Sequence, residues 1–215
     1  MVRAYLAPMP RYIGRENLRK RLEPYQGAPG RMSYEAGSVR IELPEESLAV
    51  RPPFGLAHEG SYETVELGPL FEALAMDHVV VALLVRLGGF AVGVFEGERL
   101  VASKVGTRFV KGRHKKGGSS ANRFRRRREQ QARELIEAAA RTALEVLGPW
   151  ESRAEFAALG GDRRAVREVL GAEPRLGWLG ERALPRFFTT GDPRLRDLER
   201  LPYELYAAET TEGAG

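Results

Sequence analysis

The sequence predicts an α/β (α+β) protein with a mixed β-sheet, a three-strand meander and a long helix that follows a glycine-rich basic loop. Three observations predict this class. Strand-like segments at 79–86, 90–96 and 99–105 follow one another across short turns, as in a meander. A segment at about 120–147 repeats its apolar residues with a 3.6-residue period. Strand and helix signals then alternate towards the C-terminus, which is typical of an α/β domain.

The N-terminal third carries weaker signals. Residues 12–25 predict a short amphipathic helix that has Ile13, Leu18 and Leu22 on its apolar side and ends at Pro24. Stretches rich in proline and glycine separate the elements that follow. In order, we expect a loop at 26–37, a strand at 38–43, a loop at 51–61, a strand at 62–67 and a short helix at 69–76.

The central elements have clearer signals. The segment VVVALLVR at 79–86 is apolar on both faces, as in a buried strand. The helix at 120–147 can take Ser119 or Ser120 as its N-cap and stops at Gly148. Beyond it we expect a strand at 153–158, a helix at 163–170 capped by Asp162, a strand at 183–189, a helix at 194–201 and a disordered tail at 207–215.

Charge is distributed unevenly along the chain. The net charge is +5, from 34 Lys and Arg against 29 Asp and Glu. Residues 100–128 contain eleven of these cations and no acid, so the remainder of the chain has a net charge of −6. A positive field this concentrated predicts a polyanionic partner, most often nucleic acid. The alternative is a solvated basic face, although such a face normally mixes the two signs of charge.

Composition excludes several classes of site. The chain has no cysteine, which excludes disulfides, thiolate metal sites and cysteine nucleophiles, and its three scattered histidines do not suit a zinc site. We therefore expect no metal and no cofactor. The N-terminus has no apolar signal-peptide core, and the longest near-apolar run, 78–85, is far shorter than the roughly 20 residues of a membrane helix. We expect a cytoplasmic protein with no membrane partner.

The segment that carries the chemistry is KGRHKKGGSSANRFRRRR at 111–128. Gly117 and Gly118 stand between a basic loop and the long helix, and glycine lets backbone amides approach a ligand closely. The unpaired N–H groups and positive dipole end of that helix favour an anion at the same point. A phosphate-binding P-loop is the rival motif, but Gly118 stands where its lysine should be. We expect nucleic acid to be bound by Lys111, Arg113, His114, Lys115, Lys116, Arg123, Arg125, Arg126, Arg127 and Arg128.

The run GGSSANRFRRRR resembles the catalytic loop of the eukaryotic and archaeal class I release factors, whose middle domain carries GGQSA-x-RFARLR. It is also similar to the release-factor-like domain of the Vms1/ANKZF (VLRF1) family, which acts in ribosome-associated quality control. The resemblance covers about 78–205 and implies an RNase H-like middle-domain architecture. The matching positions are two glycines, the SA and RF pairs and two later basic residues, namely Gly117, Gly118, Ser120, Ala121, Arg123, Phe124, Arg126 and Arg128.

The resemblance also implies a domain organisation and a reaction. Residues 1–77 would be an N-terminal extension packed on the core, and 78–206 would be the release-factor-like domain. Water would attack the ester that joins peptide to tRNA, with Gly117, Gly118 and Ser119 as the catalytic residues. The backbone N–H at position 119 would stabilise the developing oxyanion. The family has a water-orienting Gln at this position, whereas this chain has Ser119, whose hydroxyl would hold a water less well.

Three functions stay open at this stage. The first is codon-independent hydrolysis of peptidyl-tRNA on stalled or split large ribosomal subunits, within ribosome quality control. The second is a ribosome-binding or tRNA-binding protein of the same fold that does not hydrolyse, which Ser119 favours. The third is an unrelated RNA-binding protein. For the first two, the expected partners are the rRNA of the large subunit and peptidyl-tRNA, and we expect a monomer.

Other residues have weaker cases for a role in function. His114 lies among lysines and could contact phosphate, act as a base or be an incidental loop residue. Phe109 could stack on a nucleobase or end the buried strand. We expect ordinary roles in the core or in a turn for Trp150, Trp178, Glu96 and Glu98.

Overall fold

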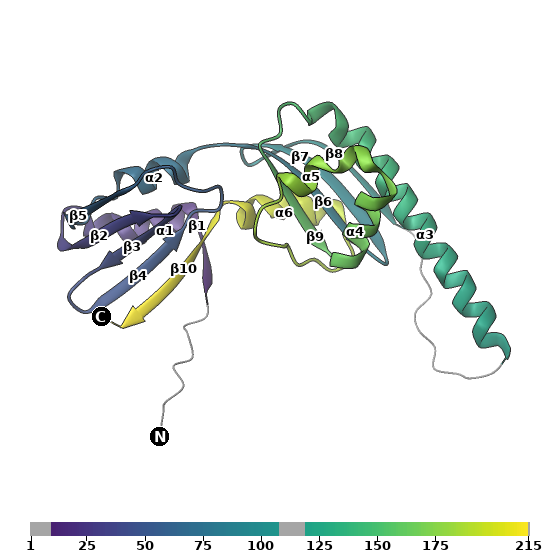
Figure 1. Cartoon of the computed structure of the whole chain (residues 1–215), viewed down its shortest axis with the longest axis horizontal. Coiled ribbons are helices and arrows are strands. Elements are labelled where there is room, and N and C mark those ends of the chain that lie inside the picture. The colour runs from purple at the N-terminus through teal and green to yellow at the C-terminus, as the bar shows by residue number, and fades with distance from the viewer. Residues whose placement is uncertain (1–9, 108–118, 215) are drawn as a thin grey trace, which may run out of the picture. The chain divides into compact units, whose positions relative to one another are not determined.

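The computed structural model describes residues 10–107 and 119–214, and it divides the chain into two compact units (Figure 1). Unit 1 joins the residues up to Met76 with those from Tyr203 onward, and unit 2 runs from Asp77 to Pro202. The predicted boundary between 77 and 78 falls beside the first crossing. The second crossing lies within helix α6 (Leu195–Leu205), so the C-terminus belongs to the same unit as the N-terminal region.

Unit 1 is a six-stranded antiparallel sheet with two short helices. The strand order is β1-β10-β4-β3-β2-β5. Its strands are β1 (Arg11–Gly14), β2 (Pro29–Glu35), β3 (Ser38–Glu42), β4 (Glu46–Arg51), β5 (Gly60–Thr64) and β10 (Ala207–Ala214). Its helices are α1 (Arg15–Leu22), α2 (Gly68–Ala75) and a 3₁₀ turn at Glu23–Tyr25.

The core of unit 1 lies between these helices and one face of the sheet. Leu18 and Leu22 of α1 and Leu70 and Leu74 of α2 are buried against alternate strand residues, which include Met32, Tyr34, Val39, Ile41, Leu48 and Val50. The Tyr34 hydroxyl donates to the carbonyl oxygen of Glu66 at 2.5 Å. Burial raises the pKa of Tyr34 to about 12, so this phenol is neutral and keeps its proton for that hydrogen bond.

Several predictions for unit 1 were wrong. Residues 26–37 were expected to be a loop, yet β2 buries Met32 and Tyr34 on one face. The helix predicted from residue 12 starts at Arg15, because 11–14 pair with β10. The tail at 207–215 was expected to be disordered, whereas β10 pairs with β1 on one side and β4 on the other. The pairings of β10 join segments distant in sequence, and local composition does not reveal them. β2 instead forms a local hairpin with β3 across Ala36 and Gly37, both at positive φ.

Unit 2 has the predicted mixed sheet, in the order β8-β7-β6-β9. The meander comprises β6 (Val79–Arg86), β7 (Gly89–Glu96) and β8 (Arg99–Thr107), and β9 (Phe156–Gly161) runs parallel to β6. The segment predicted as a strand at 183–189 is no regular strand, although Ala183 and Phe188 bridge to β9 in parallel. The remaining elements are α3 (Ser119–Leu147), α4 (Arg163–Ala172), α5 (Trp178–Glu181) and 3₁₀ turns at Gly148–Trp150 and Pro174–Leu176.

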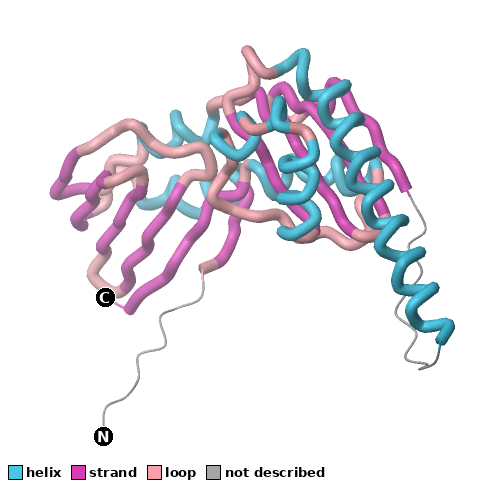
Figure 2. Tube along the Cα trace, turned by 45° about the vertical axis from the view of Figure 1, so that its right-hand side comes forward, coloured by secondary structure: helices cyan, strands magenta, loops and turns pink. Residues whose placement is uncertain are grey.

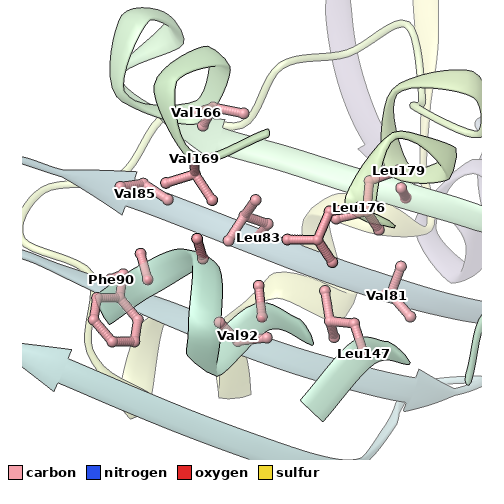
Figure 3. Close-up of a cluster of buried hydrophobic side chains, with 14 of the residues drawn as sticks. Val81, Leu83, Val85, Phe90, Val92, Leu147, Val166, Val169, Leu176 and Leu179 are labelled. Atoms are coloured by element: carbon pink, nitrogen blue, oxygen red, sulfur yellow. The ribbon is translucent and has the colours of Figure 1, made fainter. Parts of the chain in front are cut away.

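Helices cover both faces of this sheet (Figure 2). On one face, α3, α4 and α5 bury a cluster that includes Val81, Leu83, Val85, Val92, Leu147, Val166, Val169, Leu176 and Leu179 (Figure 3). Residues of a strand point alternately to the two faces, so Gly93 faces the other side. Leu198 of α6 occupies the space above Gly93, where a Cβ would stand 3.1 Å from its methyl carbon. The result is a three-layer α/β unit.

Candidate nucleic-acid interface

The basic segment connects the edge strand β8 with the helix α3. β8 ends at Thr107 and α3 begins at Ser119. The residues between them lie outside the described part of the chain, and so do several predicted site residues. These are Phe109, Lys111, Arg113, His114, Lys115, Lys116, Gly117 and Gly118. The described part of the site is therefore its root on β8 and the helix that follows, which we call the basic helix half (residues 119–134).

Close packing fixes the root of the segment. Gly106 stands beneath the ring of Phe90, and a Cβ there would lie 2.3 Å from Cζ of that ring. Gly89, on the neighbouring strand, would place a Cβ 2.7 Å from the Gly106 carbonyl oxygen. Only glycine fits such approaches. The exit of the chain from β8 is thus held by two glycines and a buried aromatic ring.

The surroundings of α3 divide it into two halves. From Leu135 onward, the side facing the sheet is buried, through Leu135, Ile136, Ala139, Ala140, Ala143 and Leu147. In the basic helix half, the described side chains are exposed or half-buried. At 1.5 Å per residue this half is about 24 Å long. Figure 1 shows it running past the end of the sheet.

Arginines surround the basic helix half on all sides. At 100° per residue, Arg123 and Arg127 lie opposite the buried stripe of the second half, and Arg126 lies beside its edge. Arg125 and Arg128 continue that stripe, so they occupy positions that are apolar further along α3. Only Arg125 has an acidic neighbour within 4.0 Å among the described residues, Glu129 at 3.8 Å. A helix charged around its circumference suits a partner that encloses it.

One cation of the acid-free stretch 100–128 is already paired within unit 2. Nζ of Lys104, on β8, binds both carboxylate oxygens of Glu145 at 2.8 Å. This pair ties β8 to the packed half of α3. Lys104 is one of the eleven cations counted in residues 100–128, and its charge is already paired.

A shallow hollow of about 440 Å³ runs along the same helix. It is lined by Arg126, Glu129, Gln130, Arg133 and Glu134. Gln130 donates to Glu134 at 3.2 Å within it. Its lining is polar and mixes both charge signs, unlike the mostly apolar pockets that bind small molecules.

Both histidines in the described ranges, His58 and His78, have structural partners. His78 is buried, and its Nδ1 lies 2.8 Å from Glu155, while Nε2 of His58 lies 2.8 Å from the Tyr62 hydroxyl. No group of three or more potential metal ligands occurs among residues 10–107 and 119–214. None of the helices in these ranges is long and apolar enough to cross a membrane.

The structure shows the positions of three residues predicted to have turn or core roles, Glu96, Trp150 and Trp178. Glu96 accepts from Arg99 and Arg153, both at 2.8 Å, and Gly97 supplies the left-handed turn at φ +61. Trp178 is buried in the core, and Trp150 packs partly exposed against it. The cation–π contact between Arg163 and Phe187, at 4.2 Å, could not be predicted from the sequence, because the two residues meet only in the folded unit.

Comparison with solved structures finds distant similarities. Similar solved structures include an archaeal translation termination factor, aRF1, at 13% identity and a TM-score of 0.42, covering 90% of this chain and 73% of that one. The Vms1 mitochondrial localization core matches at 14% identity and a TM-score of 0.42, covering 90% and 80%. The structure of another archaeal protein matches at 15% identity and a TM-score of 0.40, covering 75% of this chain and 50% of that one.

No curated protein sequence matches the chain. A model of the Actinobacteria/chloroflexi VLRF1 release factor family matches residues 78–211, a range that contains the whole basic segment and most of unit 2. Because the match spans more than half of the chain, this protein belongs to the acVLRF1 family of release factors.

Proposed function

We propose that this protein binds large ribosomal subunits that are stalled or split and hydrolyses their peptidyl-tRNA without reading a codon. The observation that carries the proposal is the basic helix half, which begins at Ser119 directly after Gly117 and Gly118. Its arginines lie around the helix and could bind phosphate groups of RNA on several sides. Its first residue, Ser119, is one of the three at which the family resemblance implies catalysis, after Gly117 and Gly118.

The expected chemistry is hydrolysis of one ester. A water oxygen adds to the ester carbonyl carbon, and negative charge develops on the carbonyl oxygen. The bond to the tRNA 3′ oxygen then breaks, that oxygen takes the proton lost by water, and the peptide leaves with a carboxyl group. No residue of this chain forms a covalent intermediate.

This chain would contribute a hydrogen-bond donor that stabilises the oxyanion. Because α3 begins at Ser119, the N–H of that residue has no acceptor within the helix. It also lies at the positive end of the helix dipole. A donor aimed at a developing oxyanion typically contributes about 10²–10³ in rate. We propose that the Ser119 N–H supplies this contribution and that its hydroxyl holds the attacking water.

Binding can be tested by sedimentation with purified large subunits over a range of salt concentrations. If about six phosphates are contacted, affinity falls on the order of a thousandfold between 50 and 200 mM salt. Replacing Arg125, Arg126, Arg127 and Arg128 with Gln should flatten that dependence. The control is Arg141→Gln/Arg200→Gln, which removes exposed charge from other helix surfaces. Unchanged sedimentation of the four-Gln variant would exclude this mode of binding.

A second candidate is a subunit-binding protein that does not hydrolyse. The observation that favours it is Ser119 at the position of the family's catalytic Gln. The two candidates differ in one assay, peptide release from large subunits that carry peptidyl-tRNA. Release by the natural chain supports hydrolysis. Release only after Ser119→Gln supports the second candidate.

A further inference from the structure

The first turn of α4 lies at the same end of the sheet as the root of the basic segment. β6, β8 and β9 run in one direction, and the register places Thr107 opposite Gly89, and Val85 opposite Gly161. Three spacings of about 4.8 Å separate β8 from β9, so Thr107 and Gly161 lie about 15 Å apart. Arg163 follows Gly161 by two residues.

Two arginines of α4 form an exposed cationic surface here, which we call the α4 patch (Arg163, Arg167 and Phe187). The guanidinium of Arg163 lies 4.2 Å from the centre of the Phe187 ring. Arg167 follows on the same side one turn later and is exposed. Within the described ranges, no carboxylate lies within 4.0 Å of either arginine. The stacked ring orients Arg163 while its N–H groups stay available for two oxygens of a phosphate.

The neighbouring cation behaves differently. Arg164 lies on another side of α4 and binds Glu168 at 2.8 Å, and this pairing raises the pKa of Arg164. The backbone N–H groups of Arg164 and Ala165 are taken by the side chain of Asp162. A ligand approaching this end of α4 would therefore meet the arginine side chains and not free backbone amides.

Helix stability does not account for the α4 patch. A cation in the first turn opposes the helix dipole, and like charges four residues apart repel each other. The first turn of α4 contains no acidic residue apart from its cap at Asp162. Residues that break a local rule without a structural gain are expected at functional sites.

We propose that the α4 patch is a second contact surface for ribosomal RNA, used together with the basic helix half. The proposal rests on the proposed function and adds to it the part of unit 2 that faces the RNA. Charge complementarity favours an RNA phosphate backbone, since planar guanidinium groups bind phosphate through two parallel hydrogen bonds. One RNA surface can span the roughly 15 Å between Thr107, where the chain leaves β8 towards the basic helix half, and Gly161, just before α4.

The experiment measures sedimentation with purified large subunits as a function of salt, for Arg163→Gln/Arg167→Gln and for the control Arg141→Gln/Arg200→Gln. Both variants lose two exposed positive charges, and thermal melting checks that both stay folded. Each lost phosphate contact lowers the salt slope by about 0.7–0.9. At 0.1 M salt this corresponds to about five- to eightfold in affinity per contact, or about 25- to 60-fold for the pair. The control should stay within twofold of the natural chain.

The outcomes separate the two proposals. Equal affinities for the α4-patch variant and its control would overturn the α4 patch, while loss of binding in the four-Gln variant of α3 would still support the proposed function. Unchanged binding in that α3 variant would overturn the proposed function instead. Repeating the measurement with protein-free rRNA identifies the partner. A defect on subunits that disappears on bare rRNA would place a ribosomal protein at the patch and refute RNA contact.

Discussion

Replacing Ser119 with proline tests the catalytic part of the account at a single atom. Proline has no backbone N–H and is tolerated in the first turn of a helix, where that N–H makes no intrahelical bond. Ser119 is the first residue of α3, so the substitution removes the proposed oxyanion donor and spares the helix. Ser119→Ala is the complementary change, because it keeps the N–H and removes only the hydroxyl.

The expected magnitudes differ between these variants. Loss of one oxyanion donor costs about 2.7–4 kcal/mol of transition-state stabilisation, or about 10²–10³ in rate. We expect Ser119→Pro to lose this much. We expect Ser119→Ala to lose less than about tenfold, because the neighbouring RNA can still hold a water. Ser120→Pro controls for the effect of a proline in the same turn and should stay close to the natural rate.

The assay is single-turnover peptide release from large subunits carrying peptidyl-tRNA, at saturating protein. Saturation removes differences in affinity, so the rate constant reports the chemical step. Release by Ser119→Pro at the natural rate would refute the role of the N–H. An equal loss in Ser119→Ala would assign the chemistry to the hydroxyl instead.

Three further predictions concern the scaffold. Asp162→Ala should lower the free energy of unfolding by about 0.5–2 kcal/mol in chemical denaturation, because Asp162 accepts from Arg164 and Ala165 at 2.8 and 2.9 Å; an unchanged midpoint would exclude the cap. Burial raises the pKa of Glu155, but hydrogen bonds from His78 and the Val79 N–H outweigh burial and leave the pKa below 4.5. The ionised carboxylate therefore contributes to the free energy of unfolding above pH 4.5, and this contribution is lost as the pH falls through the lowered pKa. Glu155→Gln should abolish that acid-dependent loss in melts at low pH. Deleting residues 207–215 removes the strand between β1 and β4 and should expose the β4 amides to hydrogen exchange, whereas unchanged protection would show that unit 1 folds without β10.

The sequence predicted unit 2 far better than unit 1. The strands at 79–86 and 90–96 and the helix α3 have strong apolar patterns, and their bounds came within one or two residues. β4 alternates Leu48 and Val50 with small residues, a signal too short to read. β10 has almost no apolar pattern, and it forms because β1 and β4 offer hydrogen-bonding edges on both sides. Such long-range pairing overrides local preference.

The candidate site also combines features that are local in the sequence with contacts that form only in the folded protein. The glycine pair and the arginine run are local in sequence, so the basic segment could be read directly from the chain. The stack of Arg163 on Phe187 joins α4 to a segment twenty residues later, and the fit of Gly106 beneath Phe90 joins two strands. Contacts of this kind depend on the tertiary fold, and no residue spacing in the sequence predicts them.

The most direct test of the central claim is peptide release by the natural chain from large subunits that carry peptidyl-tRNA but no mRNA. We expect free peptide and deacylated tRNA, with release abolished by Gly118→Ala. An intact ester under conditions in which the protein sediments with the subunits, together with release after Ser119→Gln, would contradict this claim and identify a binding protein that has lost the reaction.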